Sequence, residues 1–249
     1  MDKMQITERF HQARKGKEQF ILLEGIHAFK HAFKFGAVFE EIVYADKEQM
    51  QNLQKNVLKK EIKDFLFENG KLLEEQEFQK LIPYDIRSKV LAIVKKPKYS
   101  LEKISENKPV VFLENPANPE NIGMSVRVAA AFGAGALIVD GRISPFSASV
   151  IRASAGLVFA LPVFLIKDFS EIKNLQNRTI IVADPEGQSI KENILEKKSI
   201  IIFGTEREGV SENLKNLSDK MIKLDMQSGV SSLNLATSVS AFLFSGSFK

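Results

Sequence analysis

Three short segments of this chain place glycine or serine beside side chains that can bind or orient a polar molecule. They are residues 121–127, 204–209 and 226–234. The second and third segments each follow an apolar run typical of a β-strand, so their backbone groups are expected to face a polar small molecule. The functional side chains available there are Arg, Glu, Asn and Ser. Such a set would act by positioning and by electrostatic stabilisation.

Other kinds of chemistry are excluded from the second part of the chain. Residues 109–249 contain no His, Cys, Tyr or Trp, so His-dependent nucleophilic schemes and His-ligated metals do not fit there. The whole chain lacks cysteine, which rules out disulfides and thiolate ligands. The sequence also lacks both the Walker lysine motif and the G-x-G-x-x-G dinucleotide fingerprint.

Arg127 is the single charged residue between Asn121 and Val139. In a helix this apolar, the guanidinium must either be paired with an acid or face a ligand, because an unpaired buried charge is very costly. A structural ion pair and a role at a ligand site fit the residues about equally. Asn121 is expected to cap the helix, and Gly123 permits close approach to its first turn.

The two later segments also allow more than one interpretation. Gly204 permits a sharp turn after the preceding strand, and Glu206 is long enough to reach Arg127 or a ribose hydroxyl. A plain tight turn with solvated charges is the alternative. Ser232 and Asn234 stand at the start of an expected helix, where serine is commonly only a cap. The small residues beyond Asn234 would permit packing against another helix or another subunit.

The second part of the chain predicts an α/β fold with a mostly parallel sheet. Its short β-branched runs begin at Val110, Ala136, Val163, Thr179, Ser199 and Met221. Continuous apolar strands of this kind suit a sheet that is covered on both faces. Ligands of such sheets bind beyond the carboxyl ends of the strands, which is where the polar turns after residues 203 and 224 are expected.

The first part predicts a separate small α/β unit. Strands are expected at 20–23, 41–45, 64–67 and 90–94, with helices at 25–35, 47–60 and 74–82. Residues 95–108 are rich in Lys, Pro and Ser and have little apolar periodicity, which indicates a linker. The predicted organisation is a first domain over residues 1–98, a linker over 99–108 and a second domain over 109–249.

The net charge of +4 belongs entirely to the first part. Residues 1–108 carry 21 Lys and Arg against 17 Asp and Glu, whereas residues 109–249 carry 14 of each. Basic clusters are more often solvated faces than binding sites, so a binding role is the less common alternative. The start is charged, and no apolar run reaches the ~18 residues that span a bilayer. A soluble, cytoplasmic protein without a membrane partner is expected.

Together these motifs resemble those of the SpoU (TrmH-like) RNA ribose 2'-O-methyltransferases of the SPOUT class. The matching motifs are N-x-G-x-x-x-R at 121–127, R-A-S-A-G at 152–156, G-x-E-x-x-G at 204–209 and S-L-N at 232–234. The resemblance implies a C-terminal trefoil knot in the second domain. It also implies that the first domain is an RNA-binding domain similar to the ribosomal L30e fold. Without this resemblance, the usual rules for connections between strands predict an unknotted Rossmann-like topology.

The resemblance further implies roles for particular residues. S-adenosyl-L-methionine would be bound by Gly204, Thr205, Leu224, Met226 and Leu233, and no metal is needed. Arg127 would activate the ribose hydroxyl. The residues that would orient Arg127, the ribose and the cofactor are Asn121, Glu206, Ser232 and Asn234. Because a guanidinium is effectively never deprotonated in proteins, we expect Arg127 to hold a phosphate and to stabilise developing alkoxide charge.

One position departs from the family pattern. Asp225 stands after the cofactor-contacting Leu224, where the family usually has proline. Asp225 would either form a local hydrogen bond or perturb the cofactor pocket.

The implied substrate is RNA. The leading hypothesis is a guanosine of 23S ribosomal RNA. Ribosomal RNA is favoured over the alternative, transfer RNA, because a basic first domain suits a folded RNA. The family is dimeric through its C-terminal domain, so a homodimer is expected. A non-catalytic RNA-binding or ribosome-assembly factor that retains the fold is a second hypothesis. A nicotinamide-dependent oxidoreductase is a third, although its phosphate fingerprint is missing.

Overall fold

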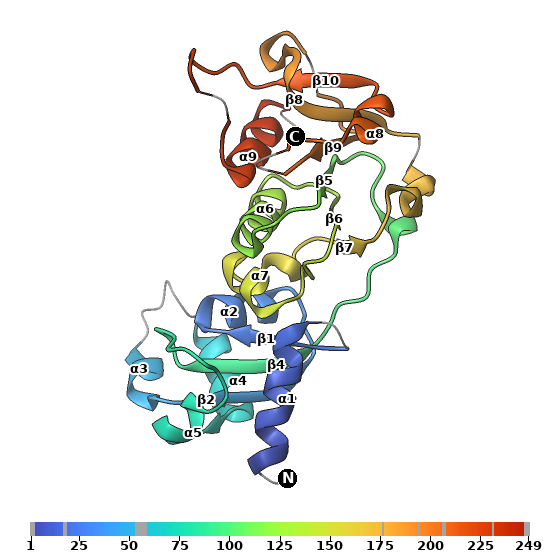
Figure 1. The fold of residues 1–249 in the computed structure, drawn as a ribbon. Coiled ribbons are helices and arrows are strands. Elements are labelled where there is room, and N and C mark those ends of the chain that lie inside the picture. Colours follow the sequence, from blue (N-terminus) through green and yellow to red (C-terminus); the bar gives the residue numbers. More distant parts are fainter. Residues whose placement is uncertain are drawn as a thin grey trace. The chain divides into compact units, whose positions relative to one another are not determined.

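The computed structural model describes residues 3–16, 19–52, 59–175, 177–193, 195–205, 208–230 and 232–246. The chain divides into two compact units (Figure 1). Unit 1 comprises Met1–Pro97 and Phe146–Ala160, and unit 2 comprises Lys98–Pro145 and Leu161–Lys249. Each unit has its own sheet and its own apolar core.

Unit 2 contains a six-stranded sheet in the order β10-β8-β9-β5-β6-β7, and all its pairings are parallel. The strands are β5 Val110–Glu114, β6 Ala136–Asp140, β7 Val163–Ile166, β8 Thr179–Ser189, β9 Ser199–Phe203 and β10 Lys220–Lys223. All six runs predicted from the sequence are strands. The predicted α/β class with a mostly parallel sheet is therefore confirmed.

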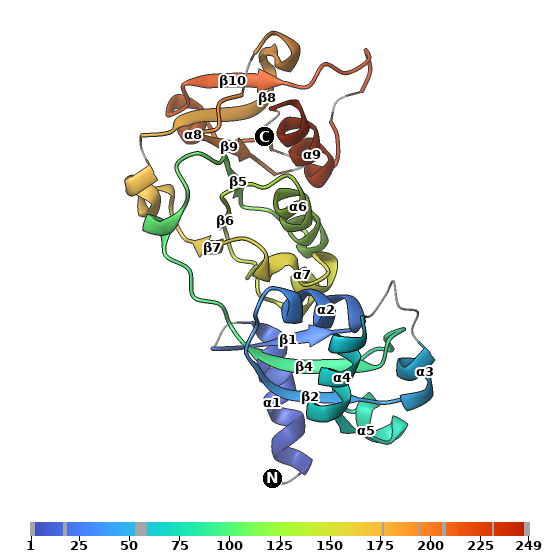
Figure 2. The ribbon, with the colours of Figure 1, turned by 180° about the vertical axis from the view of Figure 1, so that it is seen from behind.

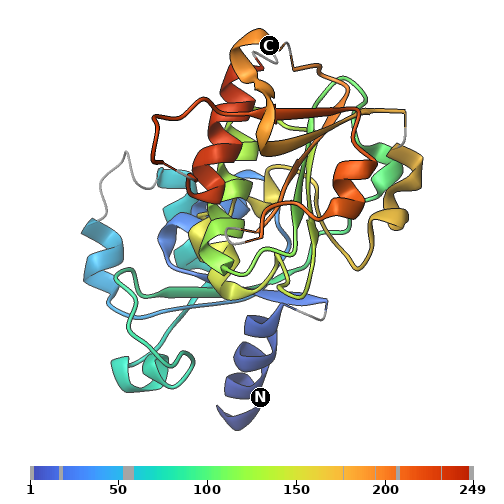
Figure 3. The same cartoon turned by 45° about the horizontal axis from the view of Figure 1, so that its top comes forward.

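Helices cover both faces of this sheet, as Figures 1 and 3 show. The helices α6 Pro119–Ala131 and α9 Leu235–Ser245 pack against each other on one face. The short helix α8 Glu212–Asn216 and the 3-10 segments η1 Leu101–Lys103 and η3 Phe169–Leu175 contribute to the core on the other face. A further 3-10 turn, η4 Ile190–Glu192, follows β8.

Asn118, and not Asn121, caps α6. The Asn118 side chain accepts a hydrogen bond from the N–H of Glu120 at 2.8 Å, and Pro119 occupies the first helical turn. Proline is favoured there because its missing N–H has no partner to lose. The prediction that Asn121 caps this helix is therefore wrong, and its side chain is buried instead.

Unit 1 has a four-stranded sheet in the order β1-β4-β2-β3. The strands are β1 Phe20–Glu24, β2 Phe39–Tyr44, β3 Lys71–Leu72 and β4 Val90–Lys95, with β4 antiparallel to both β1 and β2. The helices are α1 Lys3–Lys15, α2 Ile26–Lys34, α3 Lys47–Asn52, α4 Lys60–Asn69, α5 Glu75–Gln79 and α7 Ala148–Ala153, followed by η2 Leu157–Phe159. Figures 1 and 2 show α1 and α4 on opposite faces of the sheet.

The strand predicted at residues 64–67 is wrong, because this segment lies within α4. Ile62 and Leu66 are buried one helical turn apart. The ring of Phe65 packs on Phe33 and Phe39, with centroids 4.9 and 5.2 Å away. Periodicity alone does not distinguish a short apolar run in a strand from one in a helix.

Two segments make contacts that the predicted domain organisation did not include. Ile104, in the predicted linker, is buried in the core of unit 2, and Arg178 donates hydrogen bonds to the carbonyls of Ser105 and Lys108. Residues 146–160 pack with unit 1. Gly156, with a φ of 78°, lies so near Ala28 that a Cβ would be 2.6 Å from the Ala28 carbonyl oxygen. The trefoil knot and the L30e likeness stay predictions.

Among the described residues, no helix is both long and apolar enough to cross a membrane.

Candidate active site

A cavity of about 310 Å³ lies in unit 2, beside the middle of β8 and where β9 and β10 end. Its walls come from Asp184 and Pro185 of β8, from the turn after β9, from Lys223 and the loop after β10, and from the first turns of α9. Parallel strands end at a common edge of the sheet, so the loops that follow them converge there. This is the edge at which the sequence predicted ligand binding.

The five residues predicted to bind the cofactor all line this one cavity: Gly204, Thr205, Leu224, Met226 and Leu233. Ser232 lines it as well. Phe203 and Phe242 form part of the apolar wall, and their rings meet edge to face with centroids 5.2 Å apart. An apolar pocket with a few polar groups at its edge is the usual form of a small-molecule site.

The turn after β9 is closed so tightly that only glycine fits at its first position. The backbones of Thr205 and Gly209 exchange two hydrogen bonds, of 3.0 and 3.1 Å. The Thr205 hydroxyl accepts a further hydrogen bond from the N–H of Glu208 at 2.9 Å. A Cβ on Gly204 would lie 2.0 Å from the carbonyl carbon and oxygen of Gly209. Glu206 lies outside the described residues.

Asn121 and Asn234 are joined although they are 113 residues apart. The side-chain amide of Asn234 donates to Oδ1 of Asn121 at 2.8 Å, and its own Oδ1 accepts from the N–H of Ala236 at 3.0 Å. Asn234 therefore caps α9 and ties its start to α6. Neither asparagine lines the cavity, so their contribution in this structure is to hold the 232–234 loop in place.

Arg127 is exposed on α6, away from the buried face formed by Ile122, Val126 and Ala129. Within the described part of the chain, no hydrogen bond or ion pair reaches its guanidinium, and it does not line the cavity. The structural ion pair that the sequence allowed is therefore not found among these residues. An exposed arginine on this helix is available to a ligand that approaches from solvent.

Asp225 forms a local hydrogen bond, which is the first of the two alternatives that its position allowed. The Ser189 hydroxyl donates to its Oδ2 at 2.5 Å, and the Lys191 ammonium lies 3.6 Å from the same oxygen. The hydrogen bond from Ser189 and the charge of Lys191 lower the pKa of Asp225. Asp225 does not line the cavity.

Asp184 is a buried acid at the cavity that the sequence analysis missed. Its carboxylate lies 2.9 Å from the Lys215 ammonium and accepts a hydrogen bond from the N–H of Glu186 at 2.8 Å. Burial favours the protonated form, but the hydrogen bonds from Lys215 and Glu186 outweigh it and lower the pKa of Asp184. The available signal was an acidic residue directly after the apolar part of a predicted strand.

This ion pair predicts a pH-dependent contribution to stability. Lys215→Gln is expected to lower the free energy of unfolding by about 1 kcal/mol at pH 7. Because the folded pKa of Asp184 lies below the usual 3.8, the contribution is present above about pH 4 and is lost as the pH falls through the folded value. Urea denaturation between pH 3 and 7 measures this, and a difference between the two proteins that stays constant down to pH 3 would contradict the assignment.

The sequence matches a known family over more than half of its length. Residues 108–244 match the model of the SpoU rRNA Methylase family. An uncharacterized tRNA/rRNA methyltransferase of Archaeoglobus fulgidus is 32% identical over 139 residues, which are 54% of this chain and 62% of that protein. The 23S rRNA (uridine(2479)-2'-O)-methyltransferase of Streptomyces viridochromogenes is 28% identical over 167 residues, or 62% of this chain and 58% of that protein. The matched region thus spans less than two thirds of either relative.

The fold is also that of a solved structure. The SpoU methyltransferase AviRb from Streptomyces viridochromogenes, in complex with the cofactor AdoMet, matches with a TM-score of 0.81 at 20% identity. The match covers 97% of each chain. At this level of identity the comparison shows a shared fold that includes both units.

Proposed function

Because this chain belongs to the SpoU rRNA Methylase family, we propose that it transfers a methyl group from S-adenosylmethionine to a ribose 2'-hydroxyl of RNA. One observation carries the proposal. The residues that the family resemblance assigns to the cofactor come from two loops, the turn after β9 and the loop from β10 to α9, and they line one cavity at the strand ends.

The residues at this cavity fit S-adenosylmethionine. Phe203, Leu233 and Phe242 offer apolar surface to an adenine ring. Gly204 has no Cβ, so a ligand can come close to the peptide groups on either side of it. The Asp184 carboxylate on the wall is paired with the Lys215 ammonium, so it offers acceptor oxygens rather than net negative charge. When bound, the cofactor supplies an activated methyl group.

Arg127 has the role of receiving the RNA in this proposal. A guanidinium binds phosphate through paired N–H donors and keeps its proton throughout. From α6, Arg127 would hold a phosphate beside the target ribose and stabilise negative charge that develops on the 2'-oxygen. Asn121 and Asn234 would fix the geometry between α6 and the 232–234 loop through their hydrogen bond. Glu206 keeps its predicted orienting role.

The proposed substrate is 23S ribosomal RNA, and the proposed location of the protein is the cytoplasm. The name of the Streptomyces viridochromogenes relative specifies this RNA, and the excess of cations in residues 1–108 suits a folded polyanion. Our leading hypothesis for the nucleotide is a guanosine, whereas the relative's name specifies a uridine. Transfer RNA is the second candidate, since the Archaeoglobus fulgidus relative is described as a tRNA/rRNA methyltransferase.

The test is transfer of labelled methyl from S-adenosylmethionine to unmodified 23S ribosomal RNA and, separately, to unmodified transfer RNA. We expect the ribosomal RNA to become labelled, and we expect alkaline cleavage of this RNA to be blocked at the one methylated nucleotide. Label on transfer RNA alone would overturn the substrate. Cofactor binding without transfer to either RNA would favour the non-catalytic assembly factor, and no cofactor binding would refute the proposal as a whole.

We also propose that the chain forms a homodimer through unit 2. Met124 of α6, Phe132 directly after α6 and Phe244 of α9 are large apolar residues that are 48%, 38% and 73% exposed. The rings of Phe132 and Phe244 lie 6.3 Å apart, so they form one continuous apolar surface. Light scattering of the purified protein should give twice the chain mass, and Phe244→Glu should shift it to the monomer. A wild-type monomer at micromolar concentration would contradict this interface.

Gly204→Ala is expected to weaken S-adenosylmethionine binding at least about tenfold, because its Cβ would collide with the backbone of Gly209 and force the turn open. Titration calorimetry measures the dissociation constant. Gly133→Ala is the control: Gly133 also has a positive φ, of 72°, but a Cβ there meets no atom within 4 Å. It should lose some stability without losing affinity. Equal affinity losses in both variants would show that the effect is not local to the turn.

A further inference from the structure

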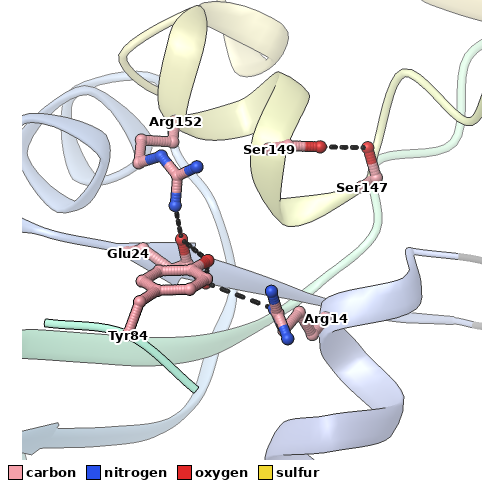
Figure 4. Close-up of polar contacts among 6 residues, drawn as sticks. All are labelled: Arg14, Glu24, Tyr84, Ser147, Ser149 and Arg152. Atoms are coloured by element: carbon pink, nitrogen blue, oxygen red, sulfur yellow. Dashed lines mark hydrogen bonds and ion pairs between the residues drawn. The ribbon is translucent and has the colours of Figure 1, made fainter. Parts of the chain in front are cut away.

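Unit 1 contains a further cavity, of about 620 Å³, built by α1, the turn before β4 and the start of α7. His11, Arg14 and Lys15 line it from α1, Tyr84 from the turn, and Ser147 and Arg152 from the α7 segment. Figure 4 shows how Arg14, Tyr84 and Arg152 gather around the buried Glu24. Arg14 and Lys15 lie outside the 108–244 segment that matches the family model.

Glu24 is fully committed to its neighbours. Its side chain has no exposed area, and both carboxylate oxygens accept from the Tyr84 hydroxyl at 2.7 Å. Nη1 of Arg152 donates to Oε2 at 2.7 Å. Burial and the neighbouring Glu24 carboxylate raise the pKa of Tyr84, so the hydroxyl stays a donor. The single Tyr84 hydrogen is thus shared between the two oxygens, and Arg152 adds a second donor at Oε2.

Arg14 is held much more loosely than Arg152. Its Nε lies 3.8 Å from Oε1 of Glu24, which is too far for a hydrogen bond, and its guanidinium lies 4.9 Å from the centre of the Tyr84 ring. Stacking on an aromatic ring positions a guanidinium without using its five N–H donors. With its side chain 35% exposed at the cavity, Arg14 can offer these donors to a ligand.

The charges around the cavity leave a positive excess. Arg14, Lys15 and Arg152 are cationic, whereas Glu8 at the wall and Glu24 beneath it are the acidic residues among the described neighbours. The Glu8 carboxylate accepts a hydrogen bond from the Gln12 amide at 3.0 Å, which occupies one of its oxygens. Two guanidiniums share the single carboxylate of Glu24, so an anion entering the cavity would complete the charge balance.

We infer that this cavity binds a phosphate group of the RNA backbone through Arg14, Lys15 and Arg152. A guanidinium fork matches two phosphate oxygens, and an ammonium adds a mobile point charge. The hydroxyls of Ser147 and Ser149 share one hydrogen bond of 3.3 Å, so one of the two keeps its hydrogen for a phosphate oxygen. The inference rests on the proposed function for the source of the phosphate. It assigns to unit 1 a defined contact on the RNA, separate from the methyl-transfer cavity of unit 2.

The test uses the full-length protein with the single variants Arg14→Gln and Lys15→Gln, because both leave the hydrogen bonds that Tyr84 and Arg152 donate to Glu24 in place. Binding to in vitro transcribed 23S ribosomal RNA is measured over a series of salt concentrations. Each phosphate contact contributes close to one unit to the slope of log K against log salt concentration. We expect each variant to bind several-fold more weakly and to have a slope shallower by about one.

Arg9→Gln is the matched control. Arg9 lies on the same helix, but it is paired with Glu41 at 3.1 Å and does not line the cavity, so this variant removes the same charge from α1 without removing the contact. Its slope should equal that of the wild type. Urea denaturation of all variants verifies that they fold. Slopes in Arg14→Gln and Lys15→Gln that equal the wild-type slope, or a wild type that binds no RNA, would overturn the inference.

Two further arms separate the possible outcomes. Titration with inorganic pyrophosphate tests whether the ligand is a free phosphate compound. If the wild type binds pyrophosphate, Arg14→Gln abolishes that binding, and the salt slope for RNA is unchanged in Arg14→Gln, then the ligand is a small anion and our assignment to RNA is overturned. Methyl transfer is measured in parallel on the same samples. Shallower slopes without any methyl transfer by the wild type would support the phosphate site while refuting the proposed enzyme activity, so the two failures are distinguishable.

Discussion

Replacing Arg127 with alanine is expected to lower methyl transfer by about 10³-fold while changing the dissociation constant for S-adenosylmethionine by less than about threefold. Removing one preorganised donor from a site of developing negative charge typically costs about 10²–10³ in rate, and Arg127 would also lose its phosphate contact. Cofactor binding should survive because Arg127 does not line the cavity of unit 2. Single-turnover transfer to 23S ribosomal RNA and titration calorimetry measure the two quantities.

Two comparison variants sharpen this experiment. Arg127→Lys keeps the charge but loses the fork of N–H donors, so it should recover only part of the rate. Lys198→Ala removes a cation at the opposite end of the same sheet, directly before β9, where Lys198 pairs with Glu106 at 3.5 Å. It should leave transfer unchanged. Turnover of Arg127→Ala within about threefold of the wild type would refute the role of Arg127.

The sequence predicted the location of the cavity well, because its residues follow strands. Gly204 comes directly after β9, and Leu224 directly after β10. In a parallel sheet these positions meet at one edge whatever the loops between them do. The sequence could not predict the exposure of Arg127 or the bond between Asn121 and Asn234. Those depend on the rotation of α6 against α9, which apolar composition alone does not specify.

The fold of unit 1 was less predictable for two reasons. The sequence of a run as short as residues 64–67 does not distinguish a strand from a helix. In the structure the run is helical, with Ile62 and Leu66 buried on the same face. The second reason is the long separation of contacting segments. Residues 146–160 lie between two strands of the second sheet along the chain, yet Gly156 fits against Ala28 and Arg152 against Glu24. Local periodicity carries no information on a contact across 128 residues.

Arg152→Ala is expected to lower the free energy of unfolding by about 2 kcal/mol. Breaking a buried ion pair typically costs about 3–5 kcal/mol, because one charge stays buried without its partner. Here the cost is reduced, since the Arg152 side chain is 44% exposed and Arg14 remains 3.8 Å from the Glu24 carboxylate. Denaturation by urea at pH 7 measures the loss, and Lys198→Ala, in a pair that is 41% and 69% exposed, should lose less than about 0.5 kcal/mol.

A double-mutant cycle separates the buried charge from lost packing. If the cost of Arg152→Ala comes from the unpaired Glu24 carboxylate, then Glu24→Gln should recover about 1 kcal/mol in the Arg152→Ala background, although it destabilises the wild type. Glutamine keeps the volume and can still accept from the Tyr84 hydroxyl. Strictly additive effects would mean that Arg152 stabilises unit 1 by packing on Tyr84, 5.0 Å from the ring centre, and that Glu24 is satisfied by Tyr84 and Arg14.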